Sequence, residues 1–178
     1  VMGSAAFPSL SHIDVAKRLN EKFGLTVLID NDLHVATNVA RKYSNYQEGI
    51  TVLYAYGKRK SGSGIIANGE VLCGASGAAG EVENIPLHTS DIESERIAFC
   101  SERLQTIIAL MNPGRVVIYE LDEGMDTDKL IGLIKSKMKP YLLPEFKLGR
   151  DFFEDCFLGL SIVCEVGIKQ SLRERLNF

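Results

Sequence analysis

The segment 64–86 holds the residues best suited to bind a small ligand. Its loop carries three closely spaced glycines and ends on a carboxylate: Gly74, Gly77, Gly80 and Glu81. Glycines let a backbone approach a ligand or another backbone closely, and a carboxylate accepts two hydroxyl hydrogen bonds, which suits a carbohydrate. A tight structural corner that ends on a solvated acid fits the same residues, so the residues alone leave both interpretations open.

A basic turn and a hairpin precede this loop. Lys58, Arg59 and Lys60 stand just before Gly62 and Gly64. The three cations could attract a phosphate by charge, although a solvated hairpin tip is the simpler interpretation. Further on, an Asn-Gly pair at 68–69 separates two apolar runs. Both central residues of such a turn must adopt positive φ, so this pair predicts a hairpin with strands over 63–67 and 70–72.

The order of these elements resembles the signature of the ROK family (repressors, open reading frames and sugar kinases). In that signature an "inG" turn is followed by "rGanGaAGEiGH", and Asn68-Gly69 and the run 74–81 follow that order and spacing. Three further segments are similar to family elements, so the likeness covers most of the chain. They are Asn31-Asp32 (the Asn-Asp element), Met111-Asn112-Pro113 with 116–118 (the "NP…IvlgG" strand) and 157–160 (the closing helix).

The resemblance implies a sugar site formed by Asn31, Asp32, Gly77, Glu81 and Asn84. In ROK kinases the Asp of the Asn-Asp element is the general base, which needs hydrogen-bond reach to the sugar hydroxyl. The Glu of the glycine segment binds sugar hydroxyls. Asp32 equally suits a helix N-cap, so both roles stay open.

Two departures from the family pattern change these implications. His34 stands where the family has Asn, and Glu83-Asn84 replaces a Gly-His pair whose His serves the sugar and, in many members, zinc. The family's cysteine-rich zinc motif is also absent from this chain. We therefore expect no metal.

The nucleotide side of the resemblance is degraded. The family's "GtGiGaG" phosphate loop, whose backbone N–H groups face the phosphate oxygens, aligns with 58–64, where only Gly62 and Gly64 remain. Glu120-Leu121 replaces the Gly-Gly that approaches the adenine, so side chains would crowd a nucleotide. The "D-x-G-G-T" strand of the N-terminal lobe is expected upstream of this chain. We therefore expect a fragment that is not a competent kinase by itself.

Apolar periodicity, caps and breakers predict the order of the elements. An early strand meander followed by alternating helices and strands predicts an α/β fold with a mixed sheet, and the resemblance implies one lobe of the actin-like ATPase, ribonuclease-H-like fold. We expect a disordered or vector-derived terminus over 1–8 and a single domain over 9–178. Gly159 and Gly167 are expected to allow close helix–sheet contact. Helices are predicted over 11–23, 31–43, 91–111, 126–138 and 151–175, with further strands over 25–29, 50–56, 116–119 and 146–148.

Composition excludes several classes of function. The chain of 178 residues is 46% hydrophobic and has a net charge of -3, and no basic stripe supports nucleic-acid binding. No apolar run approaches the roughly 18 residues that span a bilayer. The four cysteines form no Cys-x-x-Cys pair, which predicts free buried thiols in a reducing cytoplasm: Cys73, Cys100, Cys156 and Cys164.

Three functions remain open at this point. The first is the sugar-sensing, effector-binding lobe of a ROK-type transcriptional regulator, with its DNA-binding domain outside this chain. The second is a divergent sugar kinase in the full-length protein, the one case that needs ATP-Mg as a cofactor and Asp32 as a catalytic residue. The third is a non-binding dimerisation scaffold. We expect a cytoplasmic homodimer that binds a sugar or sugar phosphate and contacts neither nucleic acid nor a membrane.

Overall fold

The computed structural model describes residues 13–43, 49–57, 61–85, 92–122 and 126–176. The chain divides into two compact units, Val1–Asn31 and Asp32–Phe178. The first unit contains helix α1 (Val15–Phe23). The side chain of Asp14 caps this helix by accepting from the N–H of Lys17, and Gly24 closes it in the left-handed conformation.

The strand predicted over 25–29 is wrong. These residues adopt no strand, and they are not among the five paired strands of the described sheet. An apolar run becomes a strand only where a partner satisfies its backbone groups. The sequence pattern shows the run but not the partner.

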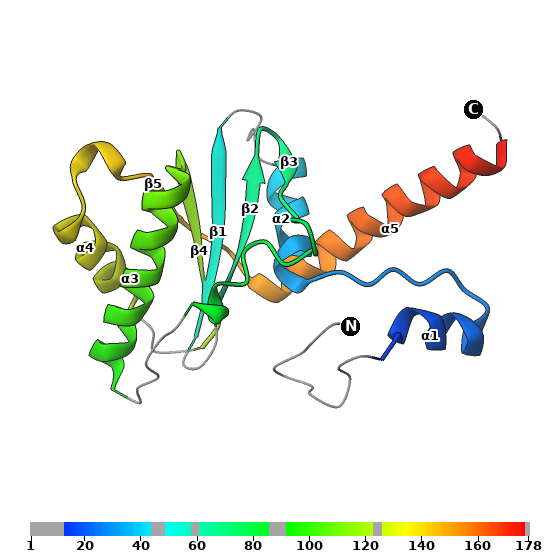
Figure 1. Ribbon diagram of the computed structural model, residues 1–178, viewed down its shortest axis with the longest axis horizontal. Helices are drawn as coiled ribbons and strands as arrows, with labels where there is room; N and C mark the ends of the chain where they lie inside the picture. Colours follow the sequence, from blue (N-terminus) through cyan, green and yellow to red (C-terminus); the bar gives the residue numbers. More distant parts are fainter. Residues whose placement is uncertain (1–12, 44–48, 58–60, 86–91, 123–125, 177–178) are drawn as a thin grey trace. The chain divides into compact units, whose positions relative to one another are not determined.

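The second unit is built on a mixed sheet with strand order β3-β2-β1-β4-β5 (Figure 1). β1, β2 and β3 form an antiparallel meander, whereas β4 runs parallel to β1 and β5 parallel to β4. This arrangement confirms the predicted α/β fold with a mixed sheet. The strands are β1 (Ile50–Tyr56), β2 (Ser61–Ala67), β3 (Glu70–Val71), β4 (Arg115–Glu120) and β5 (Glu145–Leu148).

The predicted Asn-Gly hairpin is confirmed between β2 and β3. Asn68 and Gly69 have φ of 51° and 81°, as a two-residue turn with both central residues at positive φ requires. Ala67 pairs with Glu70 across the turn. The turn therefore directs the chain into the glycine loop that follows β3.

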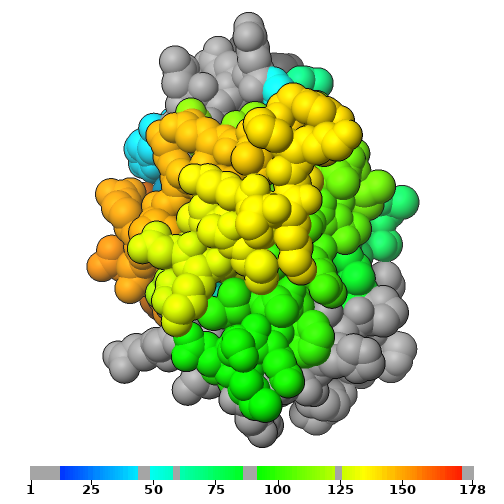
Figure 2. All heavy atoms as spheres, turned by 90° about the vertical axis from the view of Figure 1, so that its left-hand side faces the viewer, coloured from blue at the N-terminus to red at the C-terminus, as the bar shows by residue number. Residues whose placement is uncertain are grey.

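Helices cover both faces of the sheet. α3 (Glu93–Met111) and α4 (Thr127–Lys137) pack on the face that carries Val52 and Val116. Figure 2, viewed onto this side, shows α4 in yellow beside α3 in green. α2 (Asp32–Tyr43) and α5 (Phe152–Leu176) cover the opposite face, which carries Leu53 and Val117. Successive strand residues thus alternate between two cores.

The two helices of the second face touch each other through their backbones. A Cβ atom at Gly159 of α5 would overlap the backbone carbonyl of Val35 in α2. The expectation that Gly159 allows a close helix–sheet contact is therefore wrong, because its neighbour is a helix. α5 is thereby fixed along α2.

Two further predictions concern membranes and thiols. No helix in the described part of the chain is long and apolar enough to cross a membrane. The cysteines are free, but only Cys100 is fully buried, and Cys73 and Cys164 are exposed. The expectation of buried thiols is therefore wrong for these two exposed residues.

Candidate functional site

The glycine loop after β3 is tied firmly to strand β2. The carbonyl of Gly80 accepts from both the N–H (2.9 Å) and the hydroxyl (3.0 Å) of Ser63. Gly80 has φ of 90°, and a Cβ there would overlap the carbonyl of Ser63, so only glycine fits. Within the loop the N–H of Ala79 donates to the carbonyl of Cys73. These bonds fix the position of the next residue, Glu81.

His34 ties the same loop to helix α2. Its buried imidazole Nε2 lies 3.2 Å from the carbonyl oxygen of Ala79. Because a carbonyl only accepts, Nε2 carries the proton in this contact. The sequence shows His34 only as a departure from the family pattern. In the structure it holds the first turn of α2 against the loop that ends on Glu81.

Asp32 and Glu81 lie on the two segments that the contact between His34 and Ala79 joins. Asp32 is the first residue of α2; its carboxylate is exposed and accepts from the N–H of Leu33 (2.8 Å). Burial raises the pKa of Glu81 above its usual range, and the charges of Glu83 and Asp32 raise it further, while His34 opposes them. Asp32 and His34 thus lie near enough to Glu81 for their charges to act on it, and we call these three residues the Asp32–Glu81 cluster.

The remaining predicted ligand-binding residues are placed differently. Gly77 lies at the exposed tip of the loop with φ of 73°. Asn84 lies in the short helix η2 (Val82–Asn84), and its amide donates to the carbonyl of Glu81. Asn31 belongs to the first unit, where its N–H donates to the side chain of Asp30. Their contact with a ligand stays a prediction.

The predicted remnant of the phosphate loop falls into two parts. Lys58, Arg59 and Lys60 lie outside the described residues. Gly62 and Gly64 are strand residues of β2, and a Cβ at either would overlap a side chain of α2, Leu33 or Thr37 respectively. These two glycines let α2 lie directly on the strand. A role of this segment in phosphate binding stays a prediction.

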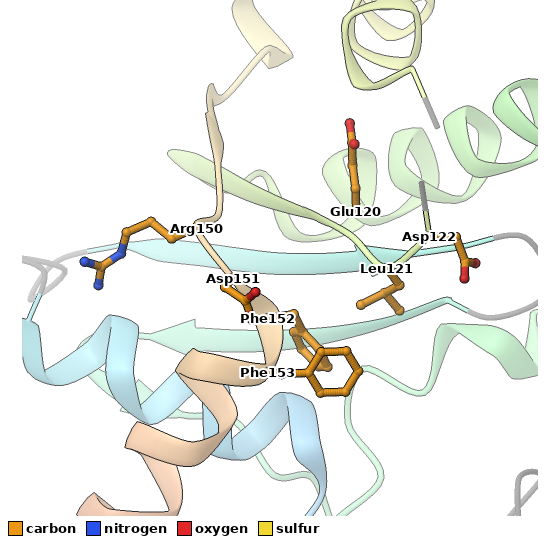
Figure 3. Close-up of a pocket in the computed structure, with 7 residues that line it drawn as sticks. All are labelled: Glu120, Leu121, Asp122, Arg150, Asp151, Phe152 and Phe153. Atoms are coloured by element: carbon orange, nitrogen blue, oxygen red, sulfur yellow. The ribbon is translucent and has the colours of Figure 1, made fainter. Parts of the chain in front are cut away.

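A separate pocket of about 290 Å³ opens at the carboxyl end of β4 (Figure 3). The carboxyl ends of parallel strands are where open α/β sheets bind ligands. Arg150 lies 3.9 Å from the buried carboxylate of Asp155, which accepts from the hydroxyl of Tyr119 (2.7 Å). The lining residues come from the end of β4 and the start of α5: Glu120, Leu121, Asp122, Arg150, Asp151, Phe152 and Phe153.

Two side chains at this pocket belong to the segment that, in the family pattern, approaches the adenine of a bound nucleotide. Glu120 and Leu121 occupy the stretch where the family pattern has two glycines, and both now line the pocket wall. Glu120 also accepts from the hydroxyl of Thr127 at the start of α4. Within the described residues, no group of three His, Cys, Asp or Glu side chains is arranged to hold a metal ion.

Several solved structures share the fold of this chain. The chain superposes on a ROK hexokinase from Thermus thermophilus (TM-score 0.67, 16% identity, 92% of this chain and 73% of that chain). It also superposes on an inorganic polyphosphate/ATP-glucomannokinase from Arthrobacter sp. (0.67, 15%, 94% and 68%). A ROK family transcriptional regulator, a homologue of the E. coli MLC protein, matches less completely (0.56, 16%, 83% and 53%). The fold is the actin-like ATPase fold of ROK sugar kinases.

The family follows from the sequence itself. The ROK family model matches residues 4–104, more than half of the chain. This chain belongs to the ROK family, as the motifs of the glycine segment predicted. No curated protein matches it. Sugar kinases and a transcriptional regulator share this fold, so the fold by itself does not distinguish these two activities.

Proposed function

We propose that this chain is the effector-binding lobe of a ROK-type transcriptional regulator and that it binds a sugar at the Asp32–Glu81 cluster. The observation that carries the proposal is the hydrogen bond between His34 and Ala79, which ties the start of α2 with Asp32 to the loop that Ser63 fixes and that ends on Glu81. Two carboxylates on a fixed frame can accept hydrogen bonds from several hydroxyls of one sugar ring. Glu81 is half-buried, which strengthens such bonds.

We prefer a regulator to a kinase because of the two segments that bind phosphate and adenine in the family pattern. Helix α2 covers the glycines at 62 and 64, so the face of β2 that it covers is closed to a phosphate. Glu120 and Leu121 add side chains where glycines would admit an adenine. A lobe that keeps its sugar carboxylates but crowds its nucleotide site suits sensing better than phosphotransfer. In this function no cofactor is needed.

A sugar kinase is the second candidate, and one observation favours it. The carboxylate of Asp32 is exposed at the start of the helix that His34 ties to the glycine loop, so it could act as a general base on a hydroxyl of a sugar held by Glu81. Kinases are among the proteins with this fold. In that case ATP-Mg would be the cofactor of the full-length protein, and its turnover would depend on Asp32.

The experiment is a thermal-shift and calorimetric screen against neutral hexoses, N-acetylhexosamines, hexose phosphates and ATP-Mg. A ligand that binds only the folded state raises the melting temperature by mass action. We expect a shift with a sugar and none with ATP-Mg. Glu81→Gln should abolish the sugar shift, because it removes a charged acceptor, whereas Glu102→Gln, an exposed glutamate on α3, should retain it.

The other outcomes are equally informative. A shift with ATP-Mg together with sugar phosphorylation, both lost in Asp32→Asn, would replace the regulator by the kinase. Equal sugar affinity in wild type and Glu81→Gln would remove Glu81 from the site. If no sugar binds, the sugar site is wrong and the scaffold function takes its place.

A further inference from the structure

Strand β5 lies at the edge of the described sheet, where no other strand of the described residues pairs with its outer side. On its inner side the N–H groups of Glu145 and Gly149 donate to carbonyl groups of the neighbouring stretch 114–118 (3.0 and 2.7 Å). Because successive residues of a strand direct these groups to opposite sides, the N–H and carbonyl groups of Phe146 and Leu148 point away from β4. The edge therefore offers a short row of donors and acceptors to an extended peptide.

The surface around this edge is open and partly apolar. Leu148 is 64% exposed, and Tyr141, in the short helix η3 (Pro140–Leu142), is 76% exposed. Leu148 follows Phe146 by two positions, so both side chains lie on the face of the sheet where Phe146 packs on the core. The chain around α4 and β5, coloured yellow to light orange, lies at the surface that faces the viewer in Figure 2. An extended peptide can thus reach the edge and place an apolar side chain against Leu148.

Basic side chains are concentrated beside the edge. Residues 127–150 carry six basic and two acidic side chains, a net charge of +4, whereas the whole chain has a net charge of -3. The Nζ atom of Lys135 lies 6.0 Å from the ring centroid of Phe146, which places the last turn of α4 next to β5. Lys137 and Lys139 follow it on the exposed surface. We call these three lysines the lysine rim, and they give this side of the edge a positive potential.

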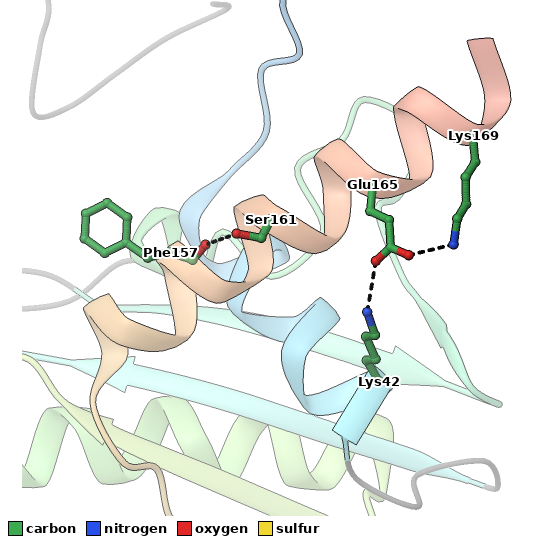
Figure 4. A network of polar contacts seen from close by, with 5 residues as sticks. All are labelled: Lys42, Phe157, Ser161, Glu165 and Lys169. Carbon is green, nitrogen blue, oxygen red and sulfur yellow. Dashed lines mark hydrogen bonds and ion pairs between the residues drawn. The ribbon is translucent and has the colours of Figure 1, made fainter. Parts of the chain in front are cut away.

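The lysine rim differs from other basic side chains of the surface. Elsewhere carboxylates neutralise lysines, as where Lys42 and Lys169 both bond Glu165 (Figure 4). No ion pair joins the lysine rim to an acid among the residues that the structure describes. Glu145 is already bonded by two basic side chains of β4 and β5, and the acids at the start of α4 lie about two turns away along the helix. The positive charge of the rim is therefore available to an acidic partner.

We propose that the outer edge of β5 binds an extended acidic segment of a partner protein, which pairs with Phe146 and Leu148 as a sixth strand and places its carboxylates against the lysine rim. Strand addition to an exposed sheet edge gives affinity through backbone bonds and specificity through side chains. Asp151 and Glu154 follow β5 at the start of α5, so the carboxylates of the segment face the rim and not the carboxyl end of the strand. The interface does not depend on a sugar or on the proposed function.

Two other occupants fit these observations less well. A second copy of β5 would bring two lysine rims together, and Lys147 within the strand itself further disfavours pairing of like edges. A nucleic acid would meet the positive charge, but its contacts are made through phosphates and base edges. It would leave the alternating backbone groups of Phe146 and Leu148 without partners.

Fluorescence anisotropy of the full chain with two labelled peptides tests the site. One peptide alternates valine with glutamate, and the other alternates valine with lysine. We expect the glutamate peptide to bind at least about 30-fold more tightly, with an affinity that falls as salt rises. Lys135→Glu/Lys139→Glu should weaken this binding by about tenfold or more, because two charges of the rim are reversed. The matched control is Arg18→Glu/Lys22→Glu, an equal change of charge on exposed α1, which should leave the affinity unchanged.

Hydrogen exchange tests the backbone pairing. With saturating glutamate peptide, the amides of Phe146 and Leu148 should exchange at least about fivefold more slowly, whereas Gly149, already bonded to Ile118, should be unchanged. Leu148→Pro removes an outward N–H that β4 does not use, and an edge strand tolerates such a proline. It should bind the peptide at least about tenfold more weakly than Leu148→Ala, which keeps the N–H. Circular dichroism and melting temperature verify that each variant is folded.

The opposite results are equally specific. Absence of binding at peptide concentrations up to about 1 mM overturns the site, as does equal affinity for the lysine peptide. A single-stranded DNA oligonucleotide that binds as tightly as the glutamate peptide, and that the reversal of the rim charges weakens equally, replaces the protein segment by a nucleic acid. Binding without protection of the Phe146 and Leu148 amides overturns the pairing with β5.

Discussion

The backbone of Gly159 in α5 lies against the carbonyl group of Val35 in α2, with no room for a side chain between them. This contact determines how closely the two helices approach on one face of the sheet. It sits between the hydrogen bond from the Cys156 thiol to the carbonyl of Asp32 and the ion pair of Lys42 with Glu165. The start of α2, which carries Asp32, is therefore held in place by α5.

Replacing this glycine should separate the two helices. Gly159→Ala is expected to lower the free energy of unfolding by about 1–3 kcal/mol, because the added methyl group forces the backbones apart. The matched control is Gly132→Ala in α4, where nothing lies within 4 Å and the better helix former should stabilise by up to about 1 kcal/mol. Urea unfolding measures both. Equal stability of Gly159→Ala and wild type would contradict the contact.

The link between His34 and Ala79 should control the mobility of the glycine loop. His34→Leu removes the imidazole that donates to the carbonyl of Ala79. Because the loop then loses this tie to α2, amide exchange at Ala79 and Ser63 is expected to become about five- to tenfold faster. The amide of Gly114, bonded to Ile50 across the sheet, serves as an internal reference.

A second variant on the same helix provides the control for His34. Asn38→Ala removes a side chain that donates to the carbonyl of His34, one turn further along α2. This change should leave exchange in the loop unaltered. If both variants loosen the loop equally, the effect comes from α2 as a whole and not from the imidazole.

The raised pKa of Glu81 predicts a dependence of stability on pH. Burial makes the folded protein bind this proton more readily than the unfolded chain, so the free energy of unfolding rises as pH falls through the raised pKa towards that of an exposed glutamate. Glu81→Gln should therefore raise the melting temperature of the unliganded protein at neutral pH. This increase in melting temperature should become smaller at acidic pH.

The control for this titration is a glutamate outside the cluster. Glu102→Gln, on the exposed side of α3, should follow the wild-type pH profile. Differential scanning calorimetry at several pH values compares the three proteins. A melting temperature for Glu81→Gln that runs parallel to wild type at every pH would show that Glu81 is not desolvated.

Local signals in the sequence predicted most of the second unit. The Asn68-Gly69 turn and the end of α3 at Asn112 both follow from left-handed residues that break regular structure. Asp126 caps α4 as its position before an amphipathic run suggests. Such features depend on a few consecutive residues, so a single sequence contains them.

Contacts between distant residues could not be predicted in this way. His34 meets Ala79 from 45 residues away. The pocket joins 120–122 to 150–153, and the partner of Gly159 is a helix that begins 127 positions earlier at Asp32. The prediction of a strand over 25–29 was wrong for the same reason. A strand needs a neighbouring strand to pair with, and the apolar run contains no information about that neighbour.

The parallel pairing of β1 with β4 has a consequence for the order of folding. Thr51 pairs with Arg115, 64 positions later, whereas Tyr56 pairs with Ser61 only five positions later. Closing the longer loop costs more chain entropy, so the antiparallel meander should assemble before β4 docks. Stopped-flow kinetics should then give Ile66→Val a larger effect on the folding rate and Val117→Ala a larger effect on the unfolding rate. The molecule would thus assemble from the meander edge of its sheet towards the parallel edge.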